Sequence, residues 1–136
     1  MSARSKARKR ALDLIFAAEA QGTPVTALLG DQVAAGDGPS NAYTVTLVEG
    51  VGEHGERLDG LISRYAEGWT LDRLPAVDRN VLRLAIYEVL YVDDVPDAVA
   101  VSEAVNLARD LSTDESPGFV NGVLGAVVRD KDSLVG

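Results

Sequence analysis

Residues 81–92 read VLRLAIYEVLYV and are apolar except for Arg83 and Glu88. A helix that is apolar on nearly every side is buried, so other helices must surround it. A buried strand would be shorter than this run, and a proline on either side brackets a window of helical length. The pattern therefore predicts a central buried helix over residues 76–93.

A second apolar pattern lies on the N-terminal side of this helix. Its members recur at alternating spacings of four and three residues: Leu47, Val51, His54, Leu58, Leu61 and Tyr65. This spacing predicts one helical stripe, with residues 52–55 as the place for a break. Residues 50–55 also match G-x-G-x-x-G, but dinucleotide binding requires a strand before the glycines and a βαβ unit around them. Because the helical spacing continues through the glycines, we expect them to permit a close helix approach or a kink.

Start and stop signals delimit the N-terminal helices. The first helix should run from the basic N-terminus to Gly22, and a short second helix, opened by a Thr-Pro pair, should end near Leu29. Residues 30–40 have the composition of a loop, and Ser40 can cap the helix that follows.

Similar signals delimit the C-terminal helices. Trp69 should close one end of the central helix, and the next helix should bury a face made of Val101, Ala104, Val105, Ala108 and Leu111. Ser112 with Glu115 fits a capping box, and Ser116 followed by proline opens a last helix that ends near residue 130. Six or seven helices with short connections and no convincing strand predict an all-α bundle, and the length is typical of one domain over residues 1–136.

The composition excludes several classes of protein. The chain has no cysteine, which excludes disulfides and thiolate chemistry, and with 1 histidine it has no H-x-x-x-H or comparable spacing of metal ligands. No apolar run reaches the ~20 residues that cross a bilayer, and the basic N-terminus lacks the pattern of a secretory signal. We therefore expect a soluble cytoplasmic protein without membrane, metal or cofactor, and a binding module in place of an enzyme.

The charges are distributed unevenly along the chain. The first ten positions contain no acid and these cations: Arg4, Lys6, Arg8, Lys9 and Arg10. All 21 acidic residues come later, in a chain whose net charge is −8. Helical geometry should spread the cations around the exposed faces of the first helix. This arrangement is typical of a polyanion-binding segment on an acidic body, and a solvated basic tail is the alternative.

Three segments carry a resemblance to a known family. They are ARKRALDLIFAAE at residues 7–19, LDRLPAVDRNVLRLAIYEVLYVDDVP at 71–96 and SEAVNLARDLSTDESPGFVNGVLG at 102–125. In order and spacing, over nearly the whole chain, they resemble the NusB family of bacterial transcription antitermination factors. The resemblance is most specific in the run from Glu115 to Leu124, taken together with the central helix.

The resemblance implies an all-helical fold of two small bundles and no catalytic activity. Members of this family bind the single-stranded boxA element of leader and ribosomal RNA as a heterodimer with NusE, the ribosomal small-subunit protein S ten. The complex helps RNA polymerase to read through terminators during ribosomal RNA transcription. The basic first helix corresponds to the arginine-rich RNA-binding segment of the family.

Site residues follow from the resemblance and from the physics of RNA recognition. Cations contact phosphates, whereas unpaired bases stack on aromatic rings and are read at their edges. The candidates for base contacts, each with packing as its alternative role, are Tyr65, Glu115, Phe119 and Asn121. The family commonly has aspartate at the position of Glu115. The resemblance implies a NusE-docking surface at the start of the central helix, with a solvated first turn as the alternative, at Asp78, Arg79, Leu82 and Arg83.

Two other functions are compatible with the sequence. A NusB-like domain also begins a ribosomal RNA methyltransferase, so a fragment of such an enzyme is one alternative, although no methyl-donor domain precedes Gly136. A helical protein–protein adaptor, whose basic helix binds a different acidic partner, is the other. The sequence does not distinguish a monomer from a homodimer, because a helical face that pairs with its own copy reads like a heterodimer face.

Overall fold

The computed structural model describes residues 2–135, which form eight α-helices and one 3-10 helix and include no strand. The prediction of an all-α fold is confirmed. The helix count slightly exceeds the expected six or seven because residues 131–135 form a short helix of their own. The chain divides into two compact units, Met1–His54 and Gly55–Gly136.

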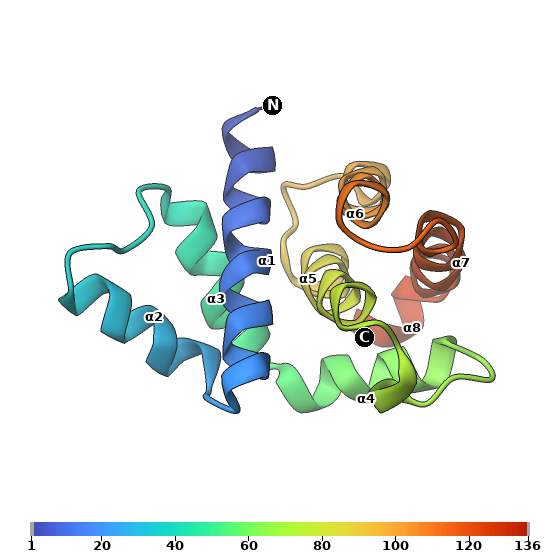
Figure 1. Cartoon of the computed structure of the whole chain (residues 1–136). Helices are drawn as coiled ribbons and strands as arrows, with labels where there is room; N and C mark the ends of the chain where they lie inside the picture. Colours follow the sequence, from blue (N-terminus) through green and yellow to red (C-terminus); the bar gives the residue numbers. More distant parts are fainter. Residues whose placement is uncertain (1, 136) are drawn as a thin grey trace. The chain divides into compact units, whose positions relative to one another are not determined.

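The first unit contains α1 (Ala3–Gln21), α2 (Val25–Ala34) and α3 (Ala42–Glu53), and α1 packs against both of the others (Figure 1). The hydroxyl of Ser2 caps α1 by accepting from the N–H of Ser5 at 3.0 Å. The hydroxyl of Thr44 donates to the carbonyl of Ala7 at 3.0 Å, so α3 approaches the backbone of α1 where α1 carries a small side chain. The predicted stop at Gly22 is confirmed by its φ of 68°, a left-handed conformation that favours glycine.

The segment between α1 and α3 differs from the prediction in two details. α2 continues through Gly30 as far as Ala34, although the expected loop began at Gly30. A glycine inside a helix costs about 1 kcal/mol relative to alanine, and the contacts of α2 with α1 and α3 offset that cost. Asn41, not Ser40, caps α3: its side-chain oxygen accepts from the N–H of Tyr43 at 2.8 Å.

The glycine-rich stretch at residues 50–55 is helical on both sides of a break. α3 ends at Glu53 and α4 (Gly55–Tyr65) begins directly after His54, so the predicted break is confirmed. A Cβ added to Gly52 would lie 2.9 Å from Cγ2 of Thr26 on α2, closer than packed side chains tolerate. Gly52 therefore permits the close approach of α2 and α3, as the helical reading of this stretch required.

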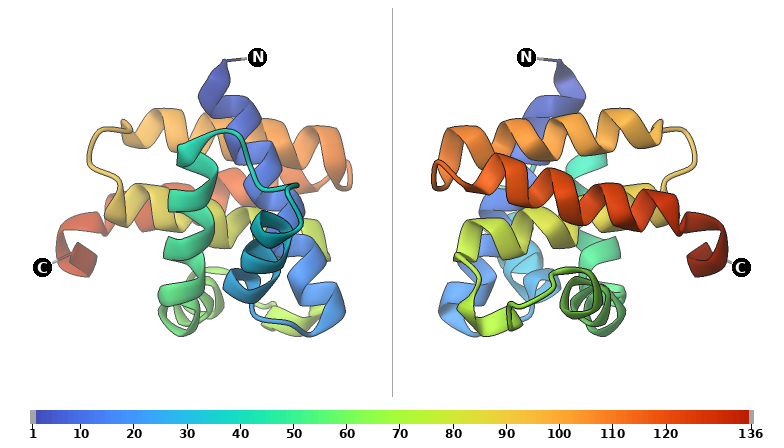
Figure 2. Two further views of the ribbon diagram at one scale, coloured as in Figure 1. Left: turned by 90° about the vertical axis from the view of Figure 1, so that its left-hand side faces the viewer. Right: turned by 90° about the vertical axis from the view of Figure 1, so that its right-hand side faces the viewer.

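The second unit continues from α4 with η1 (Leu71–Arg73), α5 (Ala76–Tyr91), α6 (Asp97–Leu111), α7 (Ser116–Arg129) and α8 (Lys131–Val135). α6 and α7 run side by side along α5 (Figure 2), and α4 packs against α5 and α7, running across the direction of α5 (Figure 1). α5 contacts α4, α6, α7 and α8, which confirms it as the central helix of this unit. None of the helices within residues 2–135 is long and apolar enough to cross a membrane.

Burial of α5 accounts for its central place. The side chains of Leu82, Leu84, Ile86 and Val89 are almost entirely buried, and each contributes about 1.5–3 kcal/mol relative to an exposed position. The buried face of α6 differs from the prediction: Ala100 and Leu107 are buried with Ala104 and Ala108, whereas Leu111 is exposed. The apolar periodicity of α6 was ambiguous because small and β-branched residues occur on both sides of the helix.

Candidate nucleic-acid interface

The basic N-terminal turns of α1 lie beside Tyr43 of α3. The guanidinium carbon of Arg4 is 4.2 Å from the centroid of the Tyr43 ring, and that of Arg8 is 5.7 Å from it. Arg8 is only 3% exposed, so the prediction that it lies on an exposed face is wrong. Lys9 forms an ion pair with Asp13 one turn later, at 2.9 Å. Two of the predicted RNA-binding cations, Arg4 and Arg8, thus pack against the ring of Tyr43 within the first unit.

Lys6 and Arg10 border a hollow of about 480 Å³ in the first unit, which Ser40 and Asn41 also line. Nη2 of Arg10 donates to Oε1 of Gln32 at 2.8 Å and to the backbone carbonyl of residue 37 at 3.2 Å, which orients its guanidinium. Lys6 is exposed. Two cations beside a hydroxyl and an amide offer the donors that a phosphate group accepts from.

Glu115 and Phe119, two of the candidate base-contacting residues, line one hollow of about 220 Å³ in the second unit. Trp69 lines it as well, and its ring centroid is 6.4 Å from that of Phe119 with an interplanar angle of 64°. Phe119 is half-buried, so it is neither a core residue nor a fully exposed one. The alternative that Phe119 belongs to the core is therefore wrong.

The other two base-contacting candidates lie elsewhere. Asn121 is exposed and lines a separate hollow between α6 and α7. It lies two residues after Phe119 on α7, and two residues along a helix place a side chain on nearly the opposite side. The hydroxyl of Tyr65 donates to Oδ2 of Asp130 at 2.7 Å. This hydrogen bond and, secondarily, burial raise the pKa of Tyr65 above its ordinary value of 10.0. The guanidinium carbon of Arg64 lies 5.1 Å from the Tyr65 ring centroid, where a base would otherwise stack.

Asp78 joins α5 to the start of α7. Its carboxylate is 3% exposed and accepts from the hydroxyl of Ser112 at 2.6 Å and from that of Ser116 at 2.9 Å. Oγ of Ser116 also lies 2.8 Å from Oγ1 of Thr113. The predicted capping box is wrong: no side chain caps α7, and both serines bind Asp78 instead. The alternative to partner docking was that Asp78 lies on a solvated first turn of the central helix. Its burial shows that this alternative is wrong for Asp78.

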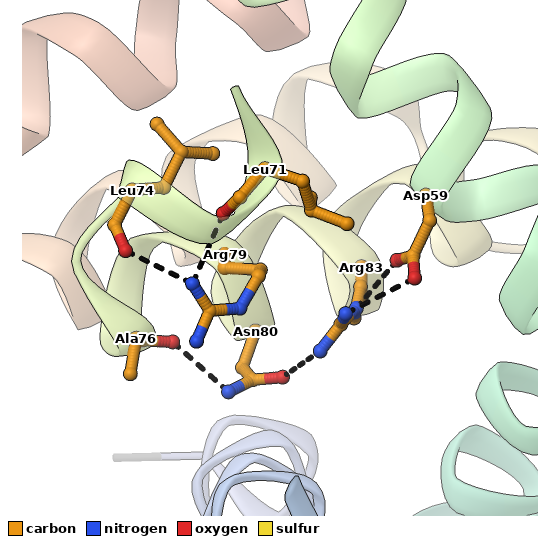
Figure 3. Close-up of polar contacts among 7 residues, drawn as sticks. All are labelled: Asp59, Leu71, Leu74, Ala76, Arg79, Asn80 and Arg83. Atoms are coloured by element: carbon orange, nitrogen blue, oxygen red, sulfur yellow. Dashed lines mark hydrogen bonds and ion pairs between the residues drawn. The ribbon is translucent and has the colours of Figure 1, made fainter. Parts of the chain in front are cut away.

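Arg79 and Arg83 are engaged in hydrogen bonds within the second unit (Figure 3). Nη1 of Arg79 donates to the backbone carbonyls of Leu71 and Leu74 at 3.1 and 2.9 Å. Arg83 forms a bidentate ion pair with Asp59: Nε donates to Oδ1 at 2.6 Å and Nη2 donates to Oδ2 at 3.1 Å. Both arginines are half-buried, so they stabilise the fold while part of each side chain faces solvent.

The residues predicted to dock a partner therefore differ in accessibility. Leu82 is 0% exposed and Asp78 is nearly as deeply buried, so neither presents its side chain at the surface. The prediction that these two contact a partner directly is not compatible with their burial. The resemblance indicated the segment that docks but not which side of the helix faces solvent, and a helix that is apolar all round gives no periodic signal for that side.

Sequence reasoning missed two aromatic residues. Trp69, expected only to close one end of the central helix, is 51% exposed and contacts Phe119. Its position between a glycine and a threonine, outside any apolar stripe, was the available signal. Tyr43 was missed because nothing in the sequence links it to the cations of α1 before the first unit is folded.

Comparison with known proteins identifies close relatives. The NusB family model matches residues 5–129. The transcription antitermination protein NusB of Nocardioides sp. strain JS614 is 65% identical over 134 residues, covering 98% of this chain and 99% of that protein. The NusB protein of Salinispora arenicola is 56% identical over 130 residues, covering 93% of this chain and 96% of its own.

Two solved structures have the same fold as this chain. The structure of T. maritima NusB matches with a TM-score of 0.84 at 33% identity, and the match covers 96% of this chain and 93% of that chain. A chain from a crystal structure of antitermination factors NusB and NusE in complex with double-stranded RNA matches with a TM-score of 0.79 at 26% identity, over 93% of this chain and 96% of its own.

Proposed function

This chain belongs to the NusB family, and we propose from that premise that it binds boxA-type RNA together with NusE, the ribosomal small-subunit protein S ten. The protein is a transcription antitermination factor and not an enzyme, as the family is. The complex with RNA and NusE promotes read-through by RNA polymerase during ribosomal RNA transcription. The protein associates with the polymerase indirectly, through this complex. Because bacterial transcription takes place in the cytoplasm, we propose a cytoplasmic location.

The observation that carries the RNA-binding proposal is the group of cations on α1. Lys6 and Arg10 border a hollow that Ser40 and Asn41 also line. The part of α1 that carries these cations contains no acidic residue before Asp13. Each phosphate neutralised by such a cation releases a counterion, so affinity falls steeply as salt rises. These contacts supply affinity without reading sequence.

Base reading is proposed for the second unit. Phe119 offers a half-buried ring and Glu115 an exposed carboxylate at the same hollow. An aromatic ring with a hydrogen-bonding group at its edge is the arrangement that recognises unpaired bases in RNA. Asn121 and the ring of Tyr65 remain candidates for contacts with neighbouring nucleotides.

Partner docking at the start of α5 is proposed through Arg79 and Arg83. A related chain was crystallised with NusE and double-stranded RNA. The net charge of −8 complements a basic ribosomal protein and would favour encounter with it. Asp78 and Leu82 would act there indirectly, by holding α5 in place.

The test is binding of a boxA RNA and of a scrambled RNA, each with and without NusE, at two salt concentrations. We expect a preference for boxA that increases with NusE, and affinities for both RNAs that fall with salt. Equal binding of the two RNAs in the presence of NusE would refute the proposed function. Lack of binding to either RNA would refute it as well and would favour the adaptor alternative.

A further inference from the structure

Trp69 has an exposure that packing does not explain. It is the only tryptophan of the chain, and 51% of its surface is accessible. Most large apolar side chains of the second unit are buried, and exposing so large an aromatic surface forgoes hydrophobic stabilisation. Exposed aromatic rings beside a hollow are typical of binding surfaces.

The turn that carries Trp69 is held in place from two sides. Gly68 adopts a φ of 81°, and the N–H of Trp69 donates to the carbonyl of Ala66 at 3.1 Å. On the other side, Nη1 of Arg79 donates to the carbonyls of Leu71 and Leu74, which fixes η1, separated from Trp69 by one residue (Figure 3). The indole is therefore presented by a braced turn, not by a loose loop.

The second ring of the hollow is held independently. Phe119 lies on α7, whose start is joined to α5 by the hydrogen bonds of Ser112 and Ser116 with Asp78. The indole and phenyl rings meet at 64°, so they form a corner. A flat group that stacks on one ring presents its edge to the other.

The chemistry of the lining selects among flat ligands. Beside the two rings, the hollow is lined by Leu74, Pro75, Asp78, Thr113, Glu115 and Ser116. They include two carboxylates and no lysine or arginine, so a phosphate would be repelled. A nucleobase is uncharged, stacks on aromatic rings and can donate from an amino group to the exposed carboxylate of Glu115.

We infer that Trp69 is a base-stacking residue that, with Phe119, holds one unpaired RNA base in this hollow. The inference rests on the proposed function and adds to it a residue that neither charge nor apolar periodicity revealed. The phosphates of that RNA segment lie outside the hollow, because its lining is acidic.

The single indole allows a direct test with the full chain. Binding of a short single-stranded boxA RNA is followed by the anisotropy of a label on the RNA and, in a parallel titration with unlabelled RNA, by tryptophan fluorescence. Stacking should quench the indole and shield it from acrylamide, with the same Kd that anisotropy gives. Base–aromatic stacking predicts that Trp69→Ala weakens binding about 5- to 150-fold, whereas Trp69→Phe retains most of the affinity.

Leu111→Ala is the matched control, since Leu111 is 40% exposed and does not line the hollow. The affinity of the Leu111→Ala variant for the boxA RNA should equal that of the unmodified protein. RNA binding without quenching or shielding of the indole would overturn the inference and leave the proposed function intact. This holds even if Trp69→Ala weakened binding, since Trp69 would then only position Phe119. Absence of RNA binding by anisotropy, with NusE added as well, would overturn both.

Discussion

Replacement of Ser116 by alanine should destabilise the second unit measurably. The hydroxyl of Ser116 donates to the buried carboxylate of Asp78 at 2.9 Å and lies 2.8 Å from the hydroxyl of Thr113. Ser116 is almost fully buried, so water has little access to replace the lost donor. The substitution therefore leaves Asp78 with one fewer hydrogen bond at the junction of α5 and α7.

The magnitude follows from the type of bond. A hydrogen bond to a charged group contributes about 1.5–3 kcal/mol. With an m value of about 2 kcal/mol/M in urea, a loss of about 2 kcal/mol in the free energy of unfolding lowers the urea midpoint by about 1 M. Ser112→Ala should cost less, because Ser112 is half-exposed and water can partly replace it. The double variant should deviate from additivity by about 0.5–3 kcal/mol, since both serines bind one carboxylate.

The assay is urea unfolding followed by Trp69 fluorescence, which reports on the unit that contains the substitution. Ser63→Ala is the matched control, because Ser63 is exposed on α4 and should change stability by less than about 0.5 kcal/mol. If Ser116→Ala shifted the midpoint no more than Ser63→Ala does, the hydrogen bond of Ser116 with Asp78 would not stabilise the junction of α5 and α7.

Three further substitutions test the interface. Lys6→Ala should weaken binding to boxA and scrambled RNA alike and lower the salt slope by about 1, as measured by titrations at several salt concentrations; an unchanged slope would exclude a phosphate contact. Glu115→Gln keeps the size of the side chain but should cost about 1–3 kcal/mol of preference for bases with an amino group, which RNAs varied one base at a time would reveal; unchanged preferences would argue against an edge contact. Asp130→Ala should lower the pKa of Tyr65 toward 10.0, in an ultraviolet titration with Tyr65→Phe as the reference. Because the folded-state pKa is raised, this hydrogen bond stabilises the fold below pH 10.0 and its contribution is lost as the pH rises through the raised pKa; a titration that Asp130→Ala leaves unchanged would contradict the hydrogen bond.

The sequence alone determined the local features of this protein. Apolar spacing identified the central helix that became α5, and glycine and proline identified most helix boundaries, because these signals act within one or two turns of chain. The basic run of α1 and the motif from Glu115 to Leu124 were sufficient to indicate the family. Burial could not be read in the same way on α5, because a helix that is apolar all round has no periodic signal for its exposed side.

The tertiary structure decided which side chains meet. Asp78 binds serines 34 and 38 residues away, so a helix-capping motif in the sequence became a junction between helices. Trp69 and Phe119 meet only once α7 packs along α5 and Arg79 fixes the turn that precedes α5. Such contacts depend on the packing of distant helices, and that packing is set by the summed burial of many side chains and not by any local pattern.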